Sequence, residues 1–211
     1  MMHERMMKRG GVWMAAVALG LLTAGQALAI PMPVPLTPED YANLGVVGEE
    51  TALVVSNYNY NNIFTGTVTS RAYELASGDY LYLYQADNAG PSVLEILALR
   101  PFYVINAAGY LTANEPAGFL AGGDVPLGMT WDQVVQNVSY NYPSWMGAHV
   151  APGDHTASLY IVSPHKPTIG EAYVIDSGTA VAEVVVPVPE PTALALVVLG
   201  AAAVVARRRR R

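Results

Sequence analysis

The sequence predicts an all-β fold: an antiparallel β-sandwich (jelly-roll-like) with an N-terminal signal helix and a C-terminal transmembrane helix. The sandwich is predicted because short runs rich in β-branched and aromatic residues follow one another, with turn-forming residues between them. No long helical period interrupts these runs, which favours two packed β layers. The two helices are predicted from an apolar stretch at each end, each flanked by basic residues. The chain therefore divides into residues 1–29, 30–186 and 187–211.

The clearest predicted strand lies in GDYLYLYQADNAG, residues 78–90. Its tyrosines fall on one face of a strand and its leucines on the other, because successive side chains alternate: Tyr80, Tyr82 and Tyr84 against Leu81, Leu83 and Gln85. Turn residues stand before and after this run. The other predicted strands lie within residues 51–60, 63–75, 92–102, 155–163, 171–176 and 179–186.

Two short helical patches are also expected. Pro38-Glu39-Asp40-Tyr41 is suited to open a helical turn. TWDQVVQNV, residues 130–138, offers Thr130 as an N-cap with Gln133 three residues later, the spacing of a capping box.

Residues 1–29 have the three parts of a secretory signal peptide. Arg5, Lys8 and Arg9 form a basic start, and residues 12–22 are apolar. Ala27 and Ala29 supply the small residues that signal peptidase requires, so we expect cleavage after Ala29. The alternative is an uncleaved anchor, which the apolar stretch is short to provide.

The C-terminus combines a proline-rich segment, an apolar run and a basic end. Pro187, Pro189 and Pro191 alternate with other residues, so this segment should be extended rather than helical. Residues 192–206 carry no charge, and as a helix they span about 22 Å. The hydrocarbon core is roughly 30 Å thick, but arginine side chains can reach the headgroups and the bilayer can thin. The predicted cytoplasmic stop is Arg207, Arg208, Arg209, Arg210 and Arg211.

The order Pro189-Glu190-Pro191, apolar run and terminal arginines resembles the PEP-CTERM sorting signal of Gram-negative bacteria. The resemblance implies recognition by an exosortase, a membrane cysteine transpeptidase, with processing near Pro-Glu-Pro. It also implies passage through the inner membrane as a precursor, with exosortase and signal peptidase as partners. The expected destination is the cell surface or extracellular polymer such as exopolysaccharide. An ordinary, uncut C-terminal anchor is the alternative.

Charge and composition exclude several classes of function. Residues 30–188 contain three Lys or Arg against fifteen Asp or Glu, a net charge of −12. A domain this acidic repels phosphate backbones, so no nucleic-acid partner is expected. The chain has no cysteine, which rules out disulfides and thiolate metal sites.

No residue pattern predicts a catalytic, cofactor or metal site. His149, Asp154 and His155 lie close in sequence and are a candidate metal cluster, but Pro152 and Gly153 prevent the helical alignment of a zinc motif. The acidic turns at residues 87–88 and 123–124 lack the series of oxygen ligands that calcium needs. We therefore expect no cofactor, no metal and no catalytic residue.

Two aromatic stretches are candidates for a sugar platform, residues 57–62 (NYNYNN) and residues 139–145 (SYNYPSW). Tyrosine and tryptophan can stack on sugar rings, yet alternate tyrosines in strands usually pack in the core, and we favour core packing. The leading hypothesis is an exported, non-enzymatic structural or adhesive protein of the surface or extracellular matrix. The alternatives are a secreted carbohydrate-binding module and an unrecognised secreted hydrolase.

Overall fold

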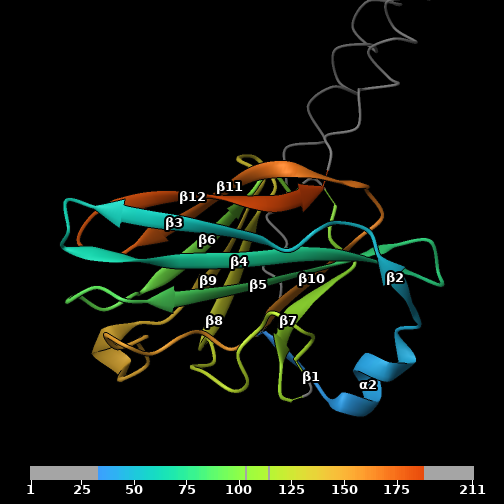
Figure 1. Cartoon of the computed structure of the whole chain (residues 1–211), viewed down its shortest axis with the longest axis horizontal. Coiled ribbons are helices and arrows are strands. Elements are labelled where there is room, and N and C mark those ends of the chain that lie inside the picture. The colour runs from blue at the N-terminus through green and yellow to red at the C-terminus, as the bar shows by residue number, and fades with distance from the viewer. Residues whose placement is uncertain (1–32, 103, 114, 188–211) are drawn as a thin grey trace, which may run out of the picture.

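Two β-sheets pack face to face, as the sequence predicts (Figure 1). The computed structural model describes residues 33–102, 104–113 and 115–187. The predicted signal helix and the predicted transmembrane helix over residues 192–206 lie outside these ranges. Within them, no helix is long and apolar enough to cross a membrane.

The larger sheet has seven strands and the smaller has five. The larger runs β1-β7-β10-β5-β4-β2, with β3 also paired to β4, and the smaller runs β12-β11-β6-β9-β8. In chain order the elements are β1 (Val34–Leu36), α2 (Pro38–Asn43), β2 (Val46–Glu49), β3 (Val54–Tyr60), β4 (Phe64–Leu75), β5 (Tyr80–Asn88), β6 (Ile96–Arg100), β7 (Ala107–Leu111), β8 (Gly128–Asp132), β9 (Asn137–Asn141), η1 (Ser144–Met146), β10 (Leu159–Ser163), β11 (Pro167–Ile175) and β12 (Thr179–Pro187).

The strand pairing departs from the predicted antiparallel arrangement at one place. β1 pairs with β7 in parallel, with Val34 opposite Gly109 and Leu36 opposite Leu111. A hairpin would force an antiparallel direction, but β1 and β7 are separated by a long stretch of chain, so either direction is available. The other strand pairs are antiparallel.

The predicted alternation in β5 is confirmed, and both faces of this strand are buried. Tyr80, Tyr82 and Tyr84 enter the main core between the two sheets. Leu81 and Leu83 enter a second cluster on the outer face of the larger sheet, which also contains Leu36 of β1 and Phe119. The two faces of β5 therefore contribute side chains to two different cores, and neither face is open to solvent.

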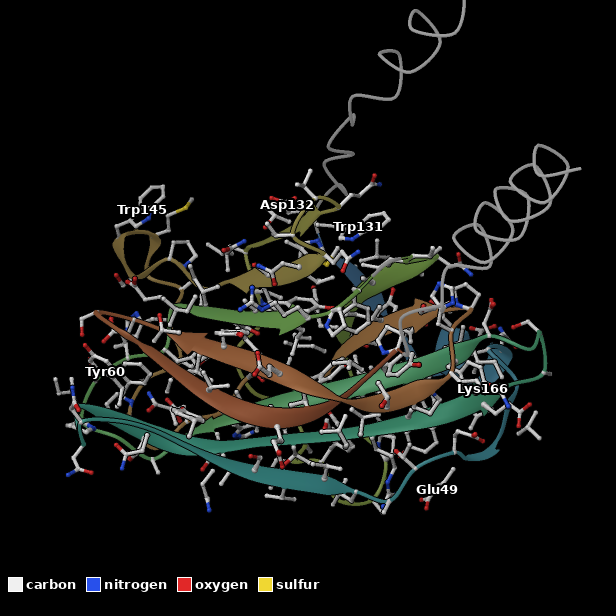
Figure 2. All side chains as sticks on the ribbon, turned by 90° about the horizontal axis from the view of Figure 1, so that it is seen from above. Glu49, Tyr60, Trp131, Asp132, Trp145 and Lys166 are labelled. Atoms are coloured by element: carbon white, nitrogen blue, oxygen red, sulfur yellow. The ribbon has the colours of Figure 1, made fainter. Side chains whose placement is uncertain are left out.

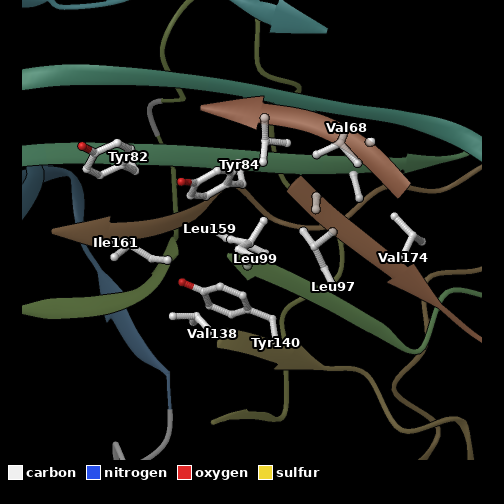
Figure 3. Packing of buried hydrophobic residues seen from close by; sticks show 14 of the residues in the cluster. Val68, Tyr82, Tyr84, Leu97, Leu99, Val138, Tyr140, Leu159, Ile161 and Val174 are labelled. Carbon is white, nitrogen blue, oxygen red and sulfur yellow. The ribbon is translucent and has the colours of Figure 1, made fainter. Parts of the chain in front are cut away.

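Tyr84 and Tyr140 lie among the buried side chains of the main core (Figure 3), and their hydroxyls donate to backbone carbonyls. Tyr84 of the larger sheet donates to the carbonyl of Val185 in the smaller sheet, at 2.6 Å. In the opposite direction, Tyr140 of the smaller sheet donates to the carbonyl of Tyr160 in the larger sheet, at 2.8 Å. Burial raises the pKa of both phenols well above the ordinary value, so both remain neutral donors.

Of the two predicted helical patches, one is confirmed and one is wrong. Residues 38–43 form α2, and Thr37 caps it by accepting a hydrogen bond from the Asp40 backbone N–H. Residues 130–138 are not a helix but the end of β8, a turn and the start of β9. Asp132 reverses the chain because its Oδ1 accepts from the backbone N–H of Val134 at 2.8 Å. Thr130 instead pairs with Ser139 across the two strands.

We expect Tyr84→Phe to lower the free energy of unfolding by about 1–2 kcal/mol, because the buried Val185 carbonyl loses its donor while the ring remains. Urea unfolding of the purified protein measures the change. Tyr60→Phe is the control, since the ring of Tyr60 stacks on Phe64 near the surface with centroids 5.4 Å apart. Equal loss in both variants would contradict a special role for the cross-sheet hydrogen bond.

The buried tyrosines also predict loss of stability at alkaline pH. Burial raises the pKa of Tyr41 to about 12, and those of Tyr84, Tyr140 and Tyr142 rise well above the ordinary 10.0. Below pH 10 both folded and unfolded states keep these protons. Above it the unfolded chain releases protons that the folded chain retains, so stability falls. The urea midpoint should therefore be flat from pH 7 to 9 and decline from pH 10 to 12. A midpoint independent of pH over that upper range would refute this expectation.

Candidate functional site

β12 is the strand that leads the domain into its C-terminal segment, and it lies at the seam between the two sheets. One edge of β12 pairs with β11, and the other faces β3 and β4 of the larger sheet. Along that second edge, the backbone N–H of Glu183 donates to Ser56 Oγ and that of Val185 donates to Ser70 Oγ, each at 3.0 Å. Serine side chains thus satisfy donors that an edge strand would otherwise leave unpaired.

The end of β12 is buried on both faces. Val184, Val185 and Val186 are each almost fully buried, so they hold the strand as far as Pro187. Pro187 is the first residue of the predicted sorting segment. The predicted sorting residues Pro189, Glu190 and Pro191, the arginines of residues 207–211 and the cleavage residues Ala27 and Ala29 lie outside the described residues. Their roles stay predictions.

The candidate metal cluster lies at the end of the sandwich where β5 finishes. The backbone of residues 153–157 runs beside residues 86–88 and 124, with Asp87 bridged to His155 and Asp124 to Thr156. Burial raises the pKa of the Asp124 carboxyl, with Asp154 adding to the rise and His149 and His155 opposing it. Among the described residues, no group of three or more His, Asp or Glu is arranged to hold a metal ion.

The acidic turns at residues 87–88 and 123–124 make structural contacts. Asn88 Nδ2 donates to the carbonyls of Ser92 and Val150, at 2.8 and 2.9 Å. At the other turn, the Asp124 backbone N–H donates to the His155 carbonyl at 2.9 Å. These contacts tie together the loops at this end of the sandwich.

Most of the candidate sugar-platform tyrosines pack in the core, as the strand alternation predicts. Tyr58, Tyr140 and Tyr142 are buried in the main cluster. Tyr60 is partly buried against it. Trp145 is the exception, because 83% of its surface is exposed. The two stretches therefore do not present a row of aromatic rings to solvent.

The structure contains a surface groove that no pattern in the sequence predicts, because its walls come from segments far apart in the chain. It has a volume of about 710 Å³ and lies over β6, β11 and β12 beside the β8–β9 turn. Its walls are aliphatic, with Val135, Ile169 and Val181 each about half exposed. Charged side chains also line it: Arg100, Glu171 and Glu183. We call this the β11–β12 groove.

The charged residues of the β11–β12 groove come from three adjacent strands. Arg100 pairs with Glu171 across β6 and β11, and Glu171 pairs with Glu183 across β11 and β12. The Arg100 guanidinium lies 4.1 Å from the centre of the Tyr173 ring, and the Tyr173 hydroxyl donates to Glu171. The alternation along β11 and β12 is visible in the sequence and places four side chains on one face: Glu171, Tyr173, Val181 and Glu183. Their position beside Arg100 and Val135 depends on how the strands pair, which the sequence does not show.

We expect Ser70→Ala to cost about 1–3 kcal/mol of unfolding free energy, because the buried Val185 N–H loses its acceptor and water cannot replace it. Ser56→Ala is the matched control at the exposed part of the same edge, where water can reach the Glu183 N–H, and should cost less. Chemical denaturation of both variants provides the comparison. A larger loss for Ser56→Ala would show that this account of the seam is wrong.

Comparison with known proteins finds one segment of the chain. A family model described as the PEP-CTERM protein-sorting motif matches residues 187–211. The match begins at Pro187, where β12 ends. No curated protein and no solved structure matches the chain. The chain thus carries the PEP-CTERM sorting motif, which indicates an extracellular protein sorted by an exosortase.

Proposed function

We propose that this chain is a non-enzymatic structural or adhesive protein of the cell surface or extracellular matrix. It is made as an inner-membrane precursor, loses residues 1–29 to signal peptidase and is processed by an exosortase near Pro189-Glu190-Pro191. Exopolysaccharide is its candidate polymer partner. The β-sandwich is the functional part of the exported product, and residues 187–211 deliver it.

The observation that carries this proposal is the direct junction between β12 and the sorting motif. The motif match starts at Pro187, and the residues before it are buried at the seam of the sandwich. A folded domain therefore reaches to within a few residues of the expected processing site. Processing there would leave the sandwich whole, because its last strand ends before the Pro-Glu-Pro sequence.

The structural role is supported by how the sandwich is filled. Large side chains with almost no exposure occupy the space between the sheets, including Tyr82, Tyr84, Tyr140 and Phe102. The hydroxyl of Tyr82 donates to the His165 carbonyl at 2.5 Å, so a third phenol is tied to the backbone. Such an interior suits a durable building unit rather than a chamber for a small substrate.

Replacing the motif by P189A/E190A/P191A should leave the precursor in the membrane fraction with its arginines intact and reduce the extracellular amount at least tenfold. The expected cause is loss of exosortase recognition. Cell fractionation followed by mass spectrometry of the C-terminal peptide measures both effects. E115A/P116A is the matched control, because it removes another Glu-Pro pair, in the partly buried loop between β7 and β8, and should not affect sorting.

Two results would overturn the proposed route. One is normal extracellular delivery of the triple variant. The other is an extracellular wild-type chain that still ends in Arg207–Arg211, which would exclude processing upstream of the arginines.

A further inference from the structure

Among the residues that the structure describes, the most exposed aromatic side chain lies on a turn closed by backbone hydrogen bonds. Trp145 belongs to η1 and is 83% exposed, and the adjacent Met146 is 56% exposed. Backbone hydrogen bonds from Met146 to Pro143 and from Gly147 to Ser144, both 2.9 Å, close the turn. Gly147 ends it in the left-handed conformation, with φ of 76°. We call Trp145 and Met146 the Trp145 knob.

A second contact fixes the base of the Trp145 knob to the smaller sheet. The Ser144 hydroxyl donates to the carboxylate of Glu95, just before β6. The Tyr142 backbone N–H also donates to the Glu95 carbonyl, at 2.6 Å. Because the turn is already ordered, binding through the knob would lose little conformational entropy.

The Trp145 knob and the β11–β12 groove lie in different parts of the domain. The knob follows the end of β9, where Asn141 pairs with Ile96 and Ile96 with Ile175. The groove includes Arg100 and Pro101, at the opposite end of β6, and the β8–β9 turn. Figure 2 shows Trp145 at one end of the molecule and Asp132, which precedes that turn, well away from it.

The chemistry of the groove matches that of an indole. Val135, Ile169 and Val181 offer aliphatic walls for the ring, and the carboxylates of Glu171 and Glu183 are acceptors for its N–H, which is donor only. Arg100 already lies over one aromatic ring, that of Tyr173, and a guanidinium is a favourable neighbour for tryptophan. A groove of about 710 Å³ also has room for the Met146 side chain beside the ring.

We propose that the Trp145 knob of one copy enters the β11–β12 groove of a second copy, so that the exported domains associate head to tail. The contact is heterologous, because knob and groove are different surfaces, and each copy has one of each. Repetition of such a contact extends a chain of molecules rather than stopping at a symmetric pair. This inference deepens the proposed structural role and rests on it for its biological meaning, whereas its physical test does not involve sorting.

The charge of the domain distinguishes this mode of assembly from an electrostatic one. Residues 30–188 carry a net charge of −12, so two copies repel each other at long range. Salt screens that repulsion and leaves the apolar insertion of the knob in place. Head-to-tail association should therefore strengthen as salt is raised from 20 mM to 300 mM, whereas contacts between opposite charges would weaken.

Sedimentation velocity of the extracellular form, purified from producing cells, tests the contact across concentration and salt. The wild-type protein should form species larger than a dimer at high concentration. Trp145→Ala and Val181→Glu should each weaken association at least tenfold, the first by removing the ring and the second by placing a charge in the groove. Leu120→Ala and Val47→Glu are the matched controls, because each makes a similar change at an exposed apolar residue outside both surfaces.

Mixing the two variants identifies the geometry. Trp145→Ala keeps an intact groove and Val181→Glu keeps an intact knob, so together they should form dimers although neither associates alone. No dimer in the mixture, or a symmetric contact that requires Trp145 from both copies, would overturn the proposal. So would a wild-type protein that stays monomeric at high salt and millimolar concentration, or binding of a soluble oligosaccharide through Trp145 without self-association. If the chain is still exported and processed in those cases, the proposed function stands and only this inference fails.

Discussion

The reciprocal hydrogen bonds between the two sheets are the constraint on which the rest of the structure depends. Tyr84 reaches from the larger sheet to a carbonyl of β12, and Tyr140 reaches from the smaller sheet to a carbonyl of β10. A buried phenol costs less free energy when its hydroxyl has an acceptor, so these two hydrogen bonds favour one placement of the sheets on each other. The chain has no cysteine, so these hydrogen bonds and the apolar core around them stabilise the domain without the disulfides that many exported domains contain.

The same region of the structure holds the residues just before the sorting motif. Tyr84 and Ser70, which are paired neighbours on β5 and β4 of the larger sheet, both bond to the backbone of Val185, one at its carbonyl and one at its N–H. Two residues later the motif begins. The domain and its sorting motif are therefore adjacent in the chain, with the last strand of the sandwich ending at Pro187, where the motif match begins.

The outer surfaces reflect a different requirement. Glu171 and Glu183 lie directly opposite each other, an arrangement that costs stability in a sheet. The nearby Arg100 is engaged with the Tyr173 ring. Departures of this kind from the most stable choice are typical of surfaces that serve a contact, and the exposed Trp145 is a second such departure. Both features lie on the two surfaces of the proposed head-to-tail contact, which gives a physical reason for them.

By itself, the sequence determined the β-rich class, the alternation of β5, the helix over residues 38–43 and the sorting motif, because each depends on residues that are neighbours along the chain. The β8–β9 hairpin was misread, since the capping-box spacing at Thr130 and Gln133 is local while the pairing of β8 with β9 and the burial of Val138 are not. The groove and the cross-sheet hydrogen bonds were decided by the tertiary structure. They join residues such as Tyr84 and Val185, which are distant in sequence and meet only when the strand order and register are set.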